Sequence, residues 1–249
     1  MNKESTKMSK KETTIKSKKL RLATIDDAQQ NMEELLVPNA GSTQAMASKM
    51  HSNYNLFPTP VFFYDLKREL TAEELAFVSD TENTTPNSGN RTSANRNVLD
   101  DSVLSSIREF CQESVDDYFT QVYAPSTDLK LRFTQSWINF TEKGQFHHKH
   151  AHPNSFISGV FYAQTTENDK IHFYNDGYQR LKVDTTSFNL WNSESWWLPA
   201  TKNHLILFPS YLTHMVETVM SESTRISISF NTFPVGHMGN DNSLTGLHV

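Results

Sequence analysis

The sequence contains very little cysteine and lacks any long apolar run. Cys111 is the single cysteine among 249 residues, so the chain can form no internal disulfide and holds no Cys-x-x-Cys zinc or redox motif. Such sparing use of cysteine is typical of a reducing compartment, and we expect a cytoplasmic protein. No stretch approaches the roughly 18 apolar residues of a membrane-spanning helix, and the N-terminus lacks the apolar centre of a secretory signal. We therefore expect no membrane partner.

Charges of the two signs are unevenly distributed along the chain. The net charge is −5, from 23 basic and 28 acidic residues. Residues 1–24 hold eight basic and two acidic residues, a local charge of +6 that leaves −11 for the remainder. Because this segment is rich in Lys, Ser and Thr, we expect residues 1–53 to form a disordered basic tail and linker. The acidic remainder argues against a nucleic-acid partner for the folded domain.

The first part of the expected folded domain shows helical patterns. A Thr-Ala-Glu-Glu capping box at 71–74 predicts a short helix over 72–80. Apolar residues at helical spacing predict a longer helix over 101–122, packed on the outside of a sheet. Cys111 belongs to the apolar face of that helix, so we interpret it as a core residue and not as a nucleophile. Residues 81–97 are rich in Thr, Asn and Ser and are expected to form a long loop.

From residue 130 onward the pattern changes to strands. Several such strands after helices predict a mostly β fold with N-terminal helices, a double-stranded β-helix (jelly roll) supported by helices on one sheet. We expect this domain to span 54–235 and a loose C-terminal tail to span 236–249. Alternating or continuous apolar runs bounded by turn residues predict strands at 131–140, 156–163, 171–174, 188–198, 204–208, 215–219 and 225–233.

Histidines gather just before one of these predicted strands. Four of the ten histidines fall within 147–152, and neutral imidazole at a strand end is a good metal ligand. A jelly roll can hold a metal with two ligands near one strand and a third far downstream. His150 and His152 with His214, 62 residues later, have this spacing. Three protein ligands leave the open positions that non-haem iron chemistry needs.

The assignment of the close ligand pair has an alternative. His148 and His150 also form a His-x-His pair, so the register of the two ligands stays open. We prefer His150 and His152 because His152 and Pro153 lead directly into the following strand. A polar loop that is merely rich in histidine is the plain alternative to a metal site.

A polar row follows the third candidate ligand. Residues 225–231 alternate with period two, which places Arg225 and Ser227 on one face of a strand. An Arg fork with a neighbouring hydroxyl can hold a carboxylate. Upstream, Asn139 lies on the strand that precedes the His cluster. Its amide can bind a carboxylate or keto group in the same cavity, or it can be a buried amide that is satisfied within the protein.

These motifs resemble a known family. His-x-His-Pro-x-Ser-x-x-Ser-Gly-Val-x-Tyr, Leu-Phe-Pro-Ser-x-x-x-His and Arg-x-Ser together are similar to the 2-oxoglutarate- and Fe(II)-dependent oxygenases of bacteria and phages. The resemblance implies that His150 and His214 bind iron. It also implies that Arg225 and Ser227 bind the far carboxylate of 2-oxoglutarate, with Tyr162 as a further contact.

One position departs from the family pattern. The superfamily has Asp or Glu where this chain has His152, so the implied site holds three histidines. Such a site carries one unit of positive charge more than a site with two histidines and a carboxylate, which changes its redox tuning.

The resemblance implies an Fe(II)- and 2-oxoglutarate-dependent dioxygenase. Such an enzyme would hydroxylate a small-molecule or peptidyl substrate and release succinate and CO2, and ascorbate is a candidate further cofactor. The loop 81–97 and the segment 191–197, with its three tryptophans, are candidate substrate-facing walls, although core packing explains the tryptophans equally well. Three rivals remain: a three-His jelly-roll metalloenzyme that does not use 2-oxoglutarate, a zinc hydrolase, and a non-catalytic jelly-roll binding or virion protein.

Overall fold

A computed structural model describes residues 52, 54–177 and 183–249. The expected disordered tail and linker, 1–53, thus lie outside the described residues apart from Ser52. Residues Asn55–Val249 form one compact unit. Among the residues described, no helix combines the length and the apolar character that crossing a membrane requires.

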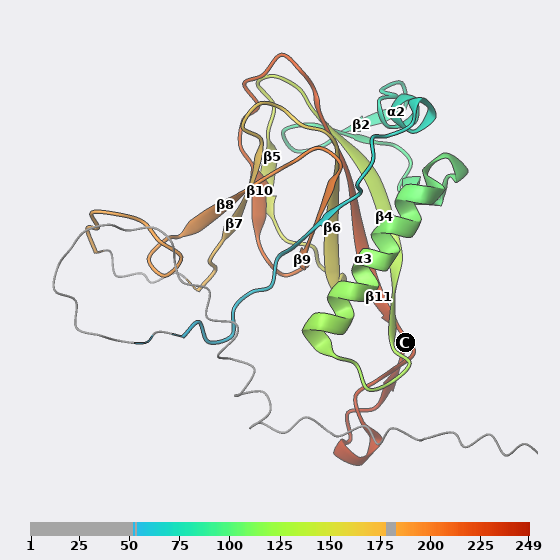
Figure 1. Cartoon of the computed structure of the whole chain (residues 1–249), viewed down its shortest axis with the longest axis vertical. Coiled ribbons are helices and arrows are strands. Elements are labelled where there is room, and N and C mark those ends of the chain that lie inside the picture. The colour runs from blue at the N-terminus through green and yellow to red at the C-terminus, as the bar shows by residue number, and fades with distance from the viewer. Residues whose placement is uncertain (1–51, 53, 178–182) are drawn as a thin grey trace, which may run out of the picture. The chain divides into compact units, whose positions relative to one another are not determined.

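Two α-helices precede most of the strands, as predicted. Helix α2 spans Ala72–Val78 and starts at the expected capping box, in which Thr71 and Glu74 exchange side-chain-to-backbone hydrogen bonds. Helix α3 spans Ser105–Tyr123. It begins later than the predicted 101–122 because two short 3-10 turns precede it. Figure 1 shows α3 lying across the strands β4, β6 and β11.

The strands form two main sheets, which confirms the predicted jelly roll. The larger sheet has the antiparallel order β1-β9-β6-β11-β4-β3-β2, and the smaller has the order β5-β10-β7-β8. The larger sheet contains β1 (Phe62–Asp65), β2 (Thr84–Pro86), β3 (Arg91–Ser93), β4 (Lys130–Thr141), β6 (Ile157–Gln164), β9 (His204–Pro209) and β11 (Arg225–Val235). The smaller sheet contains β5 (His147–His150), β7 (Lys170–Tyr174), β8 (Ser195–Pro199) and β10 (His214–Val216).

Several expected boundaries were wrong. The predicted loop 81–97 contains the hairpin of β2 and β3, whose short polar strands lack an apolar alternation. The predicted strand 188–198 is reduced to β8, and its first residues are outside any strand. The His cluster is itself a strand, β5, which pairs with β10. Within the expected tail 236–249, two short strands pair with each other: β12 (His237–Met238) and β13 (Leu247–His248).

The core lies on both faces of β6, which explains its continuous apolar run. On one face, Phe161 packs in a cluster with Cys111 and other buried residues of α3. On the other face, Tyr162 packs between the two sheets with Phe173 and Phe208. Cys111 is fully buried, and burial raises the pKa of its thiol, so the prediction that it is a core residue is confirmed. The space between the sheets is where the candidate ligands lie.

Candidate metal centre and its two cavities

Two neighbouring strands of the smaller sheet bring the predicted ligands together. His150 ends β5 and His214 begins β10, and the two residues are direct partners in the antiparallel register. His152 follows β5 by two residues, and its backbone N–H donates to the carbonyl of Ser210. This bond ties the turn after β5 to the end of β9. The backbone therefore brings the three imidazoles together, although His214 lies 62 residues after His152 in the sequence.

The three rings have a geometry that suits one metal ion. One ligand nitrogen from each of His150, His152 and His214 lies within 4.8 Å of the others. The Nε2 atoms of His152 and His214 are 3.4 Å apart. Two nitrogens bound at right angles to one metal at about 2.1 Å lie about 3.0 Å apart. The observed spacing is therefore near that of a coordinated pair.

Backbone carbonyls orient two of these rings. Nδ1 of His150 lies 2.7 Å from the carbonyl oxygen of His148, and Nδ1 of His214 lies 3.0 Å from that of Leu212. In each case the Nδ1–H donates to the carbonyl, so the lone pair is on Nε2. Such outer hydrogen bonds fix the tautomer and direction of metal-binding histidines.

Burial keeps the candidate ligands in their neutral, metal-binding form. Burial, followed by the neighbouring histidines, lowers the pKa of His214 to about 3. The same causes lower the pKa of His152 to about 4. Burial also lowers the pKa of His150, against the opposing effect of its carbonyl hydrogen bond. All three imidazoles are thus unprotonated at neutral pH, as metal ligation requires.

A second group of histidines shares His150. His147, His148 and His150 also place ligand atoms within 4.8 Å of one another. Each group contains one stacked pair of rings: His147 and His150 are tilted by 19°, and His152 and His214 by 20°. Ring orientation therefore does not separate the two groups, whereas the buried His214 belongs only to the first. In the described part of the chain, neither histidine group includes a carboxylate.

Arg225 is buried near the three histidines on the facing sheet. Its side chain is 2% exposed, and its Nε donates to both carboxylate oxygens of Asp169 at 3.0 Å. Its Nη1 donates to the hydroxyl of Ser227 at 3.4 Å. Asp169 was missed by the sequence reasoning because no motif links it to an arginine 56 residues downstream. The carboxylate fixes one edge of the guanidinium and leaves the fork of Nη1 and Nη2 available.

Two buried polar atoms near this arginine lack a partner. Nη2 of Arg225 and the hydroxyl of Tyr162 make no hydrogen bond, and the guanidinium lies 5.0 Å from the tyrosine ring centroid. Buried donors without acceptors are costly and rare in folded proteins. A ligand carboxylate would supply the missing acceptor to Nη2. The chemistry of these residues therefore suits a carboxylate, and the inner cavity as it stands has about 20 Å³ of free space, so a molecule as large as 2-oxoglutarate requires the side chains around it to move apart.

Asn139 lies on β4, opposite Ser227 of β11. Its Nδ2 donates to Ser229 Oγ at 2.9 Å and lies 3.5 Å from Ser227 Oγ, and its Oδ1 accepts from Trp137 Nε1 at 3.2 Å. The amide is thus satisfied within the protein, which is the plainer of the two interpretations of the sequence. An inner cavity is lined by Trp137, Asn139, His147, His150, His152, Val160, Ile171, His214, Val216, Arg225, Ser227 and Ser229.

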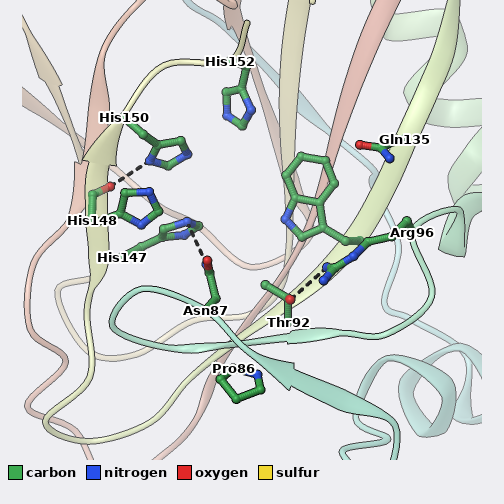
Figure 2. A pocket seen from close by; sticks show the side chains of 10 residues that line it. Pro86, Asn87, Thr92, Arg96, Gln135, His147, His148, His150 and His152 are labelled. Atoms are coloured by element: carbon green, nitrogen blue, oxygen red, sulfur yellow. Dashed lines mark hydrogen bonds between the residues drawn. The ribbon is translucent and has the colours of Figure 1, made fainter.

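An outer cavity of about 310 Å³ adjoins the histidines. It shares Trp137 and three histidines with the inner cavity. The predicted substrate wall at 81–97 does contribute here, through four of its residues. The cavity is lined by Pro86, Asn87, Thr92, Arg96, Gln135, Trp137, His147, His148, His150 and His152 (Figure 2).

The segment 191–197 was the other candidate substrate wall, and none of its residues lines either cavity. Trp196 and Trp197 belong to β8, at the edge of the smaller sheet, and are 41% and 53% exposed. The alternative that core packing explains the tryptophans is therefore wrong.

One family model matches part of the chain. Residues 135–231 match the family described as "Putative 2OG-Fe(II) oxygenase". No curated protein sequence matches the chain.

Solved structures with a similar chain course include the following three. A 2OG-Fe(II) oxygenase family oxidoreductase from Burkholderia pseudomallei is 14% identical, with a TM-score of 0.45 over 65% of this chain and 78% of that one. HygX from Streptomyces hygroscopicus, with nickel and 2-oxoglutarate bound, is 12% identical, with a TM-score of 0.46 over 70% and 82%. A prolyl hydroxylase from Trichoplax adhaerens, in complex with a hypoxia inducible factor peptide, is 11% identical, with a TM-score of 0.49 over 70% and 83%. Over residues 135–231 the chain is therefore similar to the 2OG-Fe(II) oxygenase family, whose name gives Fe(II) and 2-oxoglutarate as cofactors.

Proposed function

We propose that the protein is an Fe(II)- and 2-oxoglutarate-dependent dioxygenase that hydroxylates a small-molecule or peptidyl substrate and releases succinate and CO2. The observation that carries the proposal is the inner cavity, which joins three inward-facing imidazoles to a buried arginine with an unpartnered N–H. The family match over residues 135–231 supports the cofactors, and this arrangement of side chains supports their placement in this chain.

The proposed roles divide between the two sheets. His150, His152 and His214, from the smaller sheet, would hold Fe(II) through Nε2. Bound iron with 2-oxoglutarate supplies the oxidising chemistry that protein side chains lack. Arg225 and Ser227, from the larger sheet, would bind the far carboxylate of 2-oxoglutarate by a fork and a hydroxyl. The protein's contribution is to orient these groups and to exclude water from the space between the sheets.

Neighbouring side chains would fix the co-substrate site. Asp169 holds the Nε edge of Arg225, so the opposite fork points into the cavity. Tyr162, Ser227 and Asn139 lie abreast on the adjacent strands β6, β11 and β4. The Tyr162 hydroxyl is a second buried donor beside the arginine, and it would stabilise the same carboxylate. Asn139 would act less directly, by holding the serine hydroxyls in place.

The test is an anaerobic titration of the protein with Fe(II) and 2-oxoglutarate. A metal-to-ligand charge-transfer band is expected for the wild-type protein. Arg225→Ala is expected to weaken 2-oxoglutarate binding by roughly tenfold to a hundredfold, because hydrogen bonds to a charged group contribute about 1.5–3 kcal/mol. Arg132→Ala, on the exposed part of β4, is the matched control. No band in the wild-type protein would contradict the proposal.

One observation favours a second candidate. The ligand group contains three histidines and no carboxylate among the described residues, as in jelly-roll metalloenzymes that do not use 2-oxoglutarate. The two candidates differ in product. Succinate formed from 2-oxoglutarate in the presence of Fe(II) and dioxygen supports our proposal, whereas metal binding without 2-oxoglutarate binding supports the second candidate.

A further inference from the structure

We infer that the outer cavity binds a small-molecule substrate through an anionic group, a carboxylate or a phosphate, held by Arg96. This inference rests on the proposed function, because it places the substrate beside the proposed metal centre. In Figure 2, Arg96 and the histidines of 147–152 lie on opposite sides of this cavity.

Arg96 is held in place by the β2–β3 hairpin. Its Nη1 donates to Thr92 Oγ1 at 2.8 Å and its Nη2 donates to Thr85 Oγ1 at 3.0 Å. The two hydroxyls are themselves 3.3 Å apart, and Thr92 is buried. A guanidinium has five N–H donors, so most of its donors remain free for a ligand. Because the protein has already fixed the side chain, binding an anion there costs less conformational entropy.

The charge of this arginine is not neutralised by the protein. The outer cavity is lined by no Asp or Glu. Among the described residues, the ion pairs involve Arg68, Arg108 and Arg225 but not Arg96. With three neutral histidines as ligands, a divalent metal beside the same cavity would receive no compensating negative charge from the protein. A concave site with charge of one sign attracts the opposite sign.

The size of the outer cavity and its other lining groups limit the chemical class of the substrate further. A volume of about 310 Å³ is at the small end of ligand cavities, which hold roughly 300–1,000 Å³. Asn87 and Gln135 present amides, which pair with polar substituents. Trp137 already donates its N–H to Asn139, so its ring can offer the ligand only an apolar surface. The cavity thus suits a small polar molecule with one anionic group and one flat or apolar part.

The test is a titration of the indole N–H signals with acetate and with methyl phosphate in parallel, by NMR at constant ionic strength. The protein is loaded with Zn(II) and 2-oxoglutarate, which keeps it diamagnetic. The chain has four tryptophans, and Trp137→Phe assigns the cavity signal. Arg91→Gln is the matched control, because Arg91 also donates to a threonine of the hairpin, Thr84, but does not line the cavity.

In the wild-type protein, the anions are expected to shift the Trp137 signal at millimolar concentrations. The affinity for the anion is expected to be about tenfold or more lower in Arg96→Gln and unchanged in Arg91→Gln. A response to acetate alone indicates a carboxylate substrate, and a response to methyl phosphate alone indicates a phosphate. No response in the wild-type protein, or equal responses in the two variants, would overturn the inference. Unchanged signals from the other three tryptophans show that each variant is folded. The charge-transfer titration is independent: its failure would reject the proposed function while leaving the anion site standing.

Discussion

At the scale of single residues, the position of His152 is the most informative. The resemblance in sequence implies that it stands where the superfamily has a carboxylate, and its Nε2 lies 3.4 Å from that of His214. The sequence leaves two ligand registers open, because His148 lies the same distance before His150 as His152 lies after it. In the structure, the backbone carbonyl of His148 orients His150, which gives the residue a role that does not involve its own ring.

These contacts predict different effects for the two histidines. His152→Ala is expected to lower the affinity for Co(II) or Fe(II) by at least about a hundredfold, more than the effect of removing an outer partner. His148→Ala is expected to change it only slightly, because its carbonyl remains. The absorbance of Co(II)-loaded protein measures both. The opposite order of effects would assign the ligand pair to His148 and His150.

A second residue-scale prediction concerns charge at the metal. His152→Asp would retain three ligands and lower the charge of the centre by one unit. A lower charge favours Fe(III) over Fe(II), so the variant is expected to oxidise faster in air and to have a lower reduction potential than the wild-type protein. Electrochemistry of the 2-oxoglutarate complex measures the shift, and His148→Asp is the control. Equal potentials in the wild-type protein and His152→Asp would show that His152 does not bind the metal.

At the scale of elements, the accuracy of the sequence predictions follows how local each signal is. Strand β6 and the period-two alternation of β11 were predicted because burial on defined faces leaves a strong pattern. Hairpin β2–β3 and strand β5 were missed because their short strands are polar, and pairing alone makes them strands. The pairing of β5 with β10 joins segments that are far apart in the sequence. The spacing of His150 and His214 alone could not predict that the two residues are direct partners, which the register of the two strands shows.

The contact between Asp169 and Arg225 links the two sheets. Asp169 immediately precedes β7 of the smaller sheet, and Arg225 begins β11 of the larger one. Both side chains are at most 3% exposed. Removing one partner of a buried ion pair leaves an uncompensated charge, which costs about 3–5 kcal/mol. The pair therefore couples the stability of the sandwich to the site that is proposed for 2-oxoglutarate.

Asp169→Leu is accordingly expected to lower the free energy of unfolding by about 3 kcal/mol or more in urea denaturation. The double variant Asp169→Leu, Arg225→Leu is expected to be more stable than the single variant, because no buried charge is left unpaired. Asp100→Leu is the matched control, since its pair with Arg108 is exposed and contributes about 0–1 kcal/mol. Additive losses in the double variant would show that the two side chains are not coupled.

At the scale of the whole molecule, the two cavities draw on different parts of the chain. All the residues that we propose for iron and 2-oxoglutarate lie within 135–231, the stretch that matches the family. The wall that carries Arg96, and with it the proposed anion site, comes from the hairpin upstream of that stretch. The motif-rich part of the sequence therefore contains all the residues of the proposed cofactor site, whereas the proposed substrate wall has no motif and stands out in the sequence only as a polar segment.

The buried histidines also connect the metal centre to the stability of the whole fold. The pKa of His214 is lowered by burial to about 3 in the folded protein, against about 6.5 in an unfolded chain. Between these values the unfolded state binds more protons, so the free energy of unfolding falls as the pH is lowered from about 6.5 toward 3. At pH 5, the contribution of His214 alone is roughly 2 kcal/mol.

We therefore expect the metal-free protein to unfold at a lower urea concentration at pH 5 than at pH 7.5. In His214→Phe the difference between the two urea midpoints is expected to be smaller, because the variant lacks the imidazole that must stay unprotonated in the folded state. Zn(II) is expected to raise the free energy of unfolding at pH 7.5 by about 2.7 kcal/mol at a hundredfold excess over its dissociation constant, and the urea midpoint rises with it. At pH 5 this gain shrinks, because protons compete for the same nitrogens. His204→Phe is the control, since His204 is absent from both histidine groups. Equal pH dependence in His214→Phe and His204→Phe would show that the buried cluster does not govern the acid stability of the fold.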